Sequence, residues 1–167
     1  HPISGKSFLE LLMENQKTTT PVHQQKIFAG RERHSSSRYN TLGYPQRCIR
    51  TNQFLLVRNY KPERWPAGPG QKNKKGPNSE LGPKHNGYHD IDACPTLDYL
   101  IKGRSDSTIS KYFHLAVSKR NYEQLFNIIE DPYCINDLVG KPEYKEKHKE
   151  LADQLTNYLV QTKDPRE

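Results

Sequence analysis

The chain has 167 residues, enough for one domain with an extra segment at one end. Only 32% of the residues are hydrophobic, with 12 Pro and 10 Gly, and no apolar run approaches the roughly 20 residues that span a bilayer, so we expect no membrane segment. The net charge of +7 is uneven: residues 1–84 hold 15 Lys/Arg against 5 Asp/Glu, and residues 85–167 hold 11 against 14. The basic N-terminal half favours polyanions such as nucleic acid, anionic membrane or sulfated polysaccharide.

The N-terminal third predicts one helix and one strand. Residues 7–14 place Phe8, Leu11 and Leu12 on one helical face, and the Thr-rich run that ends at Pro21 stops this helix. Residues 25–30 have the composition of a short strand, for which nothing nearby in the sequence offers an obvious partner.

The next unit is a predicted β-hairpin. Residues 46–50 and 53–60 are two β-rich runs divided by Thr51-Asn52. Strand alternation puts Arg47 and Arg50 on opposite faces, so the two guanidinium groups cannot serve one ligand. We expect Arg47 to brace the structure through a carboxylate.

The second half predicts more helix than strand. A Pro/Gly/Lys-rich loop covers 61–86, helices follow at 95–102 and 107–118, and a strand follows at 122–129. The last helix, 142–162, carries an apolar stripe with Leu151, Leu155 and Leu159. The predicted fold is therefore α+β, a small antiparallel sheet packed against a long C-terminal helix.

Some residues that suggest chemistry have ordinary explanations. The cysteines Cys48, Cys94 and Cys134 are too few and too dispersed for a disulfide scaffold and form no C-x-x-C pair, so we expect free, packed thiols. His89, Asp90 and Asp92 have the residue types of a metal site, but capping of the helix at Pro95 by Asp92 is the favoured interpretation. The Gly5-Lys6-Ser7 run lacks the first glycine and the preceding strand of a phosphate-binding loop.

The densest cluster of candidate binding residues follows the first strand. Glu32, Arg33 and His34 come directly after an apolar run and Arg31. A carboxylate between two arginines keeps its charge, and a neighbouring His can bind or donate to an anionic group. These three residues are the candidate substrate-binding site, and the alternative is a charged strand end at the surface.

Two motifs carry a resemblance to a known family. Residues 122–166 give a short strand, Asp131-Pro132, an anchoring Leu138, a helix and a T-x-D-P end, and this order resembles the C-terminal subdomain of type I sulfatases. Residues 44–51 match the segment Y-P-x-R-x-[IV]-R-T of the branch that contains the heparan N-sulfatases, or sulfamidases. The chain departs from the family pattern at Cys134 and Asp137, where Glu and Asn are usual.

The resemblance implies a domain organisation and a function. Residues 1–40 would be the end of the sulfatase large domain, including the first helix and strand, and residues 41–167 the C-terminal subdomain. The complete protein would be a hydrolase that releases N- or O-linked sulfate from glycosaminoglycan-type sugars in the periplasm, outside the cell or in the lysosome. The segment after the first strand would lie near the sugar pocket, which favours Glu32, Arg33 and His34 as substrate-binding residues.

The family's catalytic parts are expected upstream. Type I sulfatases use a C/S-x-P/A-x-R motif, converted to formylglycine, and acidic ligands for calcium. Neither Cys48 nor Cys94 is followed by that motif. We therefore expect no catalytic residue, metal or cofactor in this chain and no activity of the chain alone. The expected partners are the upstream catalytic domain and a sulfated saccharide, with no nucleic acid or membrane partner and a dimer through the exposed N-terminal segment as a further hypothesis.

The alternative function is a non-catalytic polyanion-binding module. In that case the basic hairpin and the lysine-rich loop, including Lys74 and Lys75, would contact phosphate or sulfate. Trp65 is the only aromatic residue between Lys61 and Asn86, so the loop is poorly suited to stacking on bases.

Overall fold

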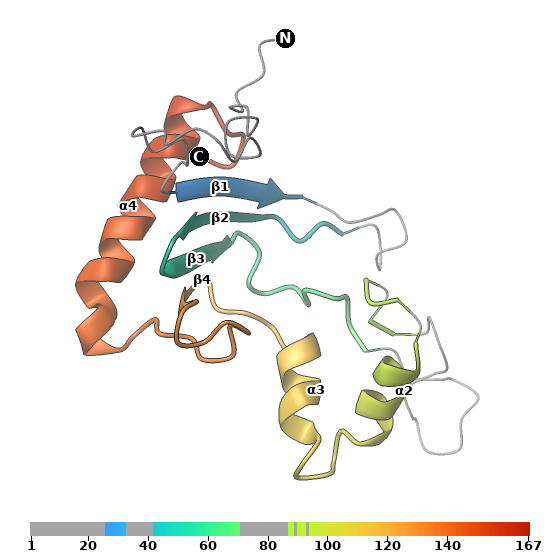
Figure 1. Ribbon diagram of the computed structural model, residues 1–167. Coiled ribbons are helices and arrows are strands. Elements are labelled where there is room, and N and C mark those ends of the chain that lie inside the picture. The colour runs from blue at the N-terminus through green and yellow to red at the C-terminus, as the bar shows by residue number, and fades with distance from the viewer. Residues whose placement is uncertain (1–25, 33–41, 71–86, 89, 93) are drawn as a thin grey trace, which may run out of the picture.

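The computed structural model describes residues 26–32, 42–70, 87–88, 90–92 and 94–167. These residues form one antiparallel sheet with the strand order β1-β2-β3-β4 and a long helix, α4, alongside it (Figure 1). The strands are β1 (Lys26–Arg31), β2 (Gln46–Thr51), β3 (Phe54–Asn59) and β4 (Glu123–Asn127), and α4 is Lys145–Gln161. The predicted α+β fold, with the long helix last, is confirmed.

The main core lies between the sheet and α4. The register places Phe28, Ile49, Leu56 and Leu125 in one row across the four strands. The apolar stripe of α4 covers this row, as the helical periodicity predicts, through Leu151, Leu155 and Leu159. Burying these side chains is the principal stabilising contribution that the described residues offer.

The strand β1 finds its partner further along the chain. All six of its residues pair with β2, from Lys26 opposite Thr51 to Arg31 opposite Gln46. The sequence near β1 offers no obvious partner for this strand. Its partner is β2, the edge strand of the hairpin, which lies 15 or more residues later in the chain. β1 therefore shares one sheet with three later strands. The domain boundary at residue 40 stays a prediction.

The outer edge of β4 is partly covered by the turn that follows it. The N–H of Leu138 donates to the carbonyl of Leu125 at 2.8 Å, and the Asp137 carboxylate accepts from the N–H groups of Leu125 and Val139 at 3.1 and 3.0 Å. Asp137 thus makes hydrogen bonds that hold this turn against the strand.

A second, smaller core lies away from α4. The helices α2 (Pro95–Lys102) and α3 (Ser110–Val117) pack together through Leu97, Phe113 and Val117 (Figure 1). The cap of α2 differs from the prediction: the N-cap is Cys94, which makes no side-chain cap hydrogen bond, and Asp92 does not cap the helix. Pro95 already supplies a residue that needs no N–H partner at the helix start, which reduces the need for a side-chain cap.

Other predictions have mixed outcomes. The helix at 7–14 and the lysine-rich part of the loop, 71–86, lie outside the described residues. The three cysteines are free thiols. No helix in the described part of the chain is long and apolar enough to cross a membrane. A short 3-10 turn, Pro142–Tyr144, precedes α4 within the predicted helix.

Candidate functional site at the end of β1

A charged row crosses the sheet next to the apolar row. The register aligns Gly30, Arg47, Arg58 and Glu123 on the face that α4 covers. Both guanidinium groups are buried, with 8% and 7% of their side chains exposed. Charged groups buried to this degree need partners, and the tail that follows α4 provides them.

The end of α4 is a tight reversal that directs this tail back over the sheet. The N–H groups of Lys163 and Asp164 donate to the carbonyls of Val160 and Leu159 at 3.1 and 2.9 Å, with Lys163 in the left-handed conformation at φ +56°. This is the Schellman pattern of helix termination. The Thr162 hydroxyl donates to the carbonyl of Tyr158 at 2.9 Å, which further fixes the last turn.

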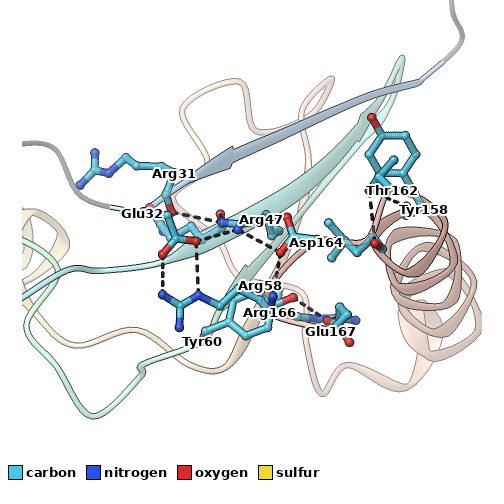
Figure 2. A network of polar contacts seen from close by, with 12 residues as sticks. Arg31, Glu32, Arg47, Arg58, Tyr60, Tyr158, Thr162, Asp164, Arg166 and Glu167 are labelled. Atoms are coloured by element: carbon cyan, nitrogen blue, oxygen red, sulfur yellow. Dashed lines mark hydrogen bonds and ion pairs between the residues drawn. The ribbon is translucent and has the colours of Figure 1, made fainter. Parts of the chain in front are cut away.

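Asp164 then meets Arg47, 117 residues earlier in the chain. The Arg47 Nε and Nη2 donate to the two oxygens of Asp164 at 2.7 and 3.0 Å, a bidentate pair (Figure 2). The Arg47 guanidinium lowers the pKa of Asp164 below its ordinary value. The expectation that Arg47 braces the structure through a carboxylate is confirmed, and Arg50, on the opposite face, is exposed.

Gly30 makes room for the Arg47 side chain. A Cβ at Gly30 would lie 2.7 Å from Cδ and 3.0 Å from Nε of Arg47. Because Asp164 holds this end of the side chain, Arg47 is not free to move aside. The glycine in the K-I-F-A-G-R strand is therefore explained by the close approach of a neighbouring side chain.

Glu32 lies between the guanidinium groups of Arg47 and Arg166. It accepts from Arg47 Nη2 at 2.6 Å, and from Arg166 Nε and Nη2 at 3.3 and 2.5 Å (Figure 2). The hydrogen bonds from Arg166, and then those from Arg47, hold the pKa of Glu32 below its usual range. Glu32 is thus an anion at neutral pH that two cations orient.

A second set of contacts ties the last residue to β3. Arg58 donates to Glu123 and Glu167 at 2.8 Å each, and Tyr60 donates its hydroxyl to Glu167 at 2.5 Å. Burial, and next the hydrogen bond to Glu167, raise the pKa of Tyr60 to about 12. His148 on α4 lies 2.7 Å from the second oxygen of Glu123.

The contacts of Arg47 with Glu32 and Asp164 border a cleft of about 460 Å³ between β1 and the end of α4. One wall carries Phe28, which stacks on Tyr158 with ring centroids 3.8 Å apart. The other wall carries the charged groups Glu32, Arg47 and Asp164. The cleft is therefore lined by both an aromatic pair and charged groups.

The predicted site residues are only partly placed by the structure. Glu32 is half-exposed and lines this cleft, whereas Arg33 and His34 lie outside the described residues. Direct substrate contact by any of the three stays a prediction. Sequence reasoning did not assign Arg166 a role, because nothing in a T-x-D-P-R end indicates that its arginine meets a carboxylate 134 residues earlier.

The described residues hold several potential metal ligands that lie apart or have other partners. Among the described residues, no group of three His, Cys, Asp or Glu side chains gathers to hold a metal ion. Asp90, part of the hypothetical metal motif, instead pairs with Arg31 at 2.9 Å and has 4% of its side chain exposed.

No protein-family model matches the chain, and no curated protein matches it. Among solved structures, the chain is similar to BT4656, whose structure was determined in complex with its substrate D-glucosamine-2-N,6-O-disulfate. The identity is 19% and the TM-score 0.47, over 95% of this chain and 20% of that one, so the chain spans about a fifth of that protein's length. A similarity at this level does not establish a shared activity.

Proposed function

We propose that this chain is the C-terminal portion of a sulfatase that releases sulfate from glycosaminoglycan-type sugars, and that this sulfatase is of the sulfamidase branch, which its motifs resemble. The observation that carries the proposal is the bidentate pair of Arg47 and Asp164. The two motifs that resemble sulfatases, Y-P-x-R-x-[IV]-R-T and T-x-D-P, are far apart in sequence, yet each contributes one partner of this buried pair. A chance match of two short motifs gives no reason for such a contact.

In this proposal the chain completes the fold and one wall of the substrate cleft. Its residues bind and orient the sugar, and Glu32 together with Arg33 and His34 borders the pocket. The nucleophile and the calcium ligands belong to an upstream domain, which would supply attack on sulfur beside a metal ion. The compartment we propose is the periplasm, the extracellular space or the lysosome.

The test compares the native protein with the chain alone. An antibody raised against this chain isolates the native protein from its source, and its intact mass shows whether further domains are attached. Sulfate release from N-sulfated glucosamine is then measured for the native protein and for the pure 167-residue chain. We expect release by the longer native protein and none by the chain. A native protein without sulfatase activity would refute the proposal, and turnover by the chain alone would refute the missing-domain part of it.

The polyanion-binding module is the competing function, favoured by the charge imbalance of the sequence. It predicts binding that weakens steeply with salt and requires no attached domain. The same isolated native protein distinguishes the two functions, because a module of this kind binds long sulfated chains without releasing sulfate.

A further inference from the structure

The two arginines that hold Glu32 differ in how many of their N–H groups are in use. An arginine has five N–H donors. Those of Arg47 are matched by five acceptors: two oxygens of Asp164, one of Glu32, and the carbonyls of Gln46 and Arg31, the last at 3.4 Å. Arg47 therefore has no donor left for a ligand.

Arg166 is only partly used. Its Nε and one N–H of Nη2 donate to Glu32, and the described residues provide no acceptor for its three other N–H groups. Its side chain is 37% exposed, whereas that of Arg47 is 8% exposed. Its backbone is also fixed, because its N–H donates to Asp164 at 3.0 Å. Arg166 thus has a guanidinium group that Glu32 orients and that has unused N–H donors accessible to solvent.

Glu32 also has capacity left. A carboxylate offers about four acceptor positions, and the described residues occupy three of them through Arg47 and Arg166. Its side chain is 47% exposed. Arg166 and Glu32 together therefore present several N–H donors and one acceptor position to solvent. Arg47, whose donors are all in use, contacts Glu32 as well.

We propose that Arg166 is a ligand-binding residue that donates to the sulfate group of a sulfated sugar, while Glu32 accepts from a hydroxyl of the same sugar unit. A guanidinium fork matches two oxygens of a tetrahedral oxyanion, which a lysine does not. The neighbouring carboxylate disfavours a ligand that is anionic throughout, so the site selects a sugar with both sulfate and hydroxyl groups. This inference rests on the proposed function for its ligand class and adds a residue that carries the sulfate contact.

The test uses the full-length protein and two ligands that differ only in the anionic group. One is a glucosamine 6-sulfonate, whose carbon–sulfur bond is not hydrolysed, and the other is glucosamine itself. Calorimetry gives both affinities for the wild type, R166A, R166K and the matched control R50A. Arg50 lies exposed on the opposite face of the sheet, so its loss removes the same charge away from the site.

The quantity of interest is the change, between wild type and variant, in the preference for the sulfonate over glucosamine. This change separates ligand contact from a structural role, which would affect both ligands equally. We expect R166A to reduce the preference for the sulfonate at least about tenfold, with R50A within about twofold of wild type. R166K keeps the charge without the fork and should lose part of the preference, which also covers the case that R166A does not fold. Equal loss of both ligands, or no preference in the wild type, would overturn the inference.

The two proposals fail separately. An Arg166-dependent preference without sulfate release from a sulfated sugar would refute the sulfatase function but leave this site in place. Sulfate release with an unchanged preference in R166A would refute the site and leave the function.

Discussion

At the scale of single residues, the site depends on how a few side chains fix one another. Arg47 is buried between Glu32 and Asp164, and it reaches them over the space that Gly30 leaves. Breaking a buried ion pair at one partner leaves an uncompensated charge, so each of these residues matters more than an exposed ion pair would.

Replacing Gly30 by alanine tests this packing directly. The new Cβ would lie 2.7 Å from Cδ of a side chain that Asp164 holds in place. We expect G30A to lower the free energy of unfolding by about 1–3 kcal/mol, the typical cost of overpacking. Urea unfolding measures the change, with A29S on the opposite strand face as the control. An unchanged midpoint for G30A would show that Arg47 moves freely.

The acid dependence of stability follows from the pKa values of Asp164 and Glu32. Both are lowered in the folded chain from ordinary values of 3.8 and 4.5, by Arg47 and Arg166 respectively. A lowered folded pKa stabilises the fold above the ordinary pKa, and this contribution disappears as pH falls through the folded pKa. We expect these two groups to contribute fully from neutral pH down to about pH 5 and to lose their contribution below about pH 4.

The D164N variant isolates one of these contributions. Urea unfolding at a series of pH values should give a shallower acid decline for D164N than for the wild type, because the variant has one carboxylate fewer to protonate. Parallel acid declines would mean that the Arg47–Asp164 pair does not affect stability.

At the scale of elements, α4 both closes the core and positions the tail. Its apolar stripe covers the central row of the sheet, and its Schellman end reverses the chain so that Asp164 and Arg166 reach β1 and β2. A stable helix–sheet core is therefore a condition for the site, and its residues Leu155 and Leu159 also line the cleft.

Leu155 is the residue with which to test this core. Its side chain is fully buried among residues of the sheet and α4. L155A should lower the free energy of unfolding by about 2–5 kcal/mol through lost transfer energy and a residual cavity. The exposed V160A serves as the matched control on the same helix. Should both variants unfold at the wild-type midpoint, α4 would not be the main support of the sheet.

At the scale of the whole molecule, the sequence predicts elements better than their partners. The hairpin around Thr51-Asn52 and the stripe of α4 follow from local alternation and periodicity, which a short window contains. The pairing of β1 with β2 does not follow from the local pattern, because a pattern that predicts a strand does not indicate which strand it pairs with. The ion pair between Arg47 and Asp164 is predictable in part. The sequence favours a carboxylate partner for Arg47, but spacing alone does not identify that carboxylate as Asp164.

The N-terminal edge of the sheet bears on assembly. In the described part of the chain no strand pairs with the outer side of β1, and Ile27 on this strand is exposed. Open strand edges are potential pairing sites. A dimer through the N-terminal segment therefore stays a prediction.

The central claim is that the segment after β1 borders a sulfated-sugar pocket. Its most direct test is the steady-state kcat/KM for sulfate release from a sulfated disaccharide by the full-length protein, for the wild type, His34→Ala and the Lys74/Lys75 double alanine. We expect His34→Ala to reduce kcat/KM at least about tenfold, equivalent to about 1.4 kcal/mol. The lysine pair should change only the salt dependence on longer chains, because exposed charges are screened within about 8–10 Å. A silent His34→Ala together with a large lysine effect on the disaccharide would contradict the claim.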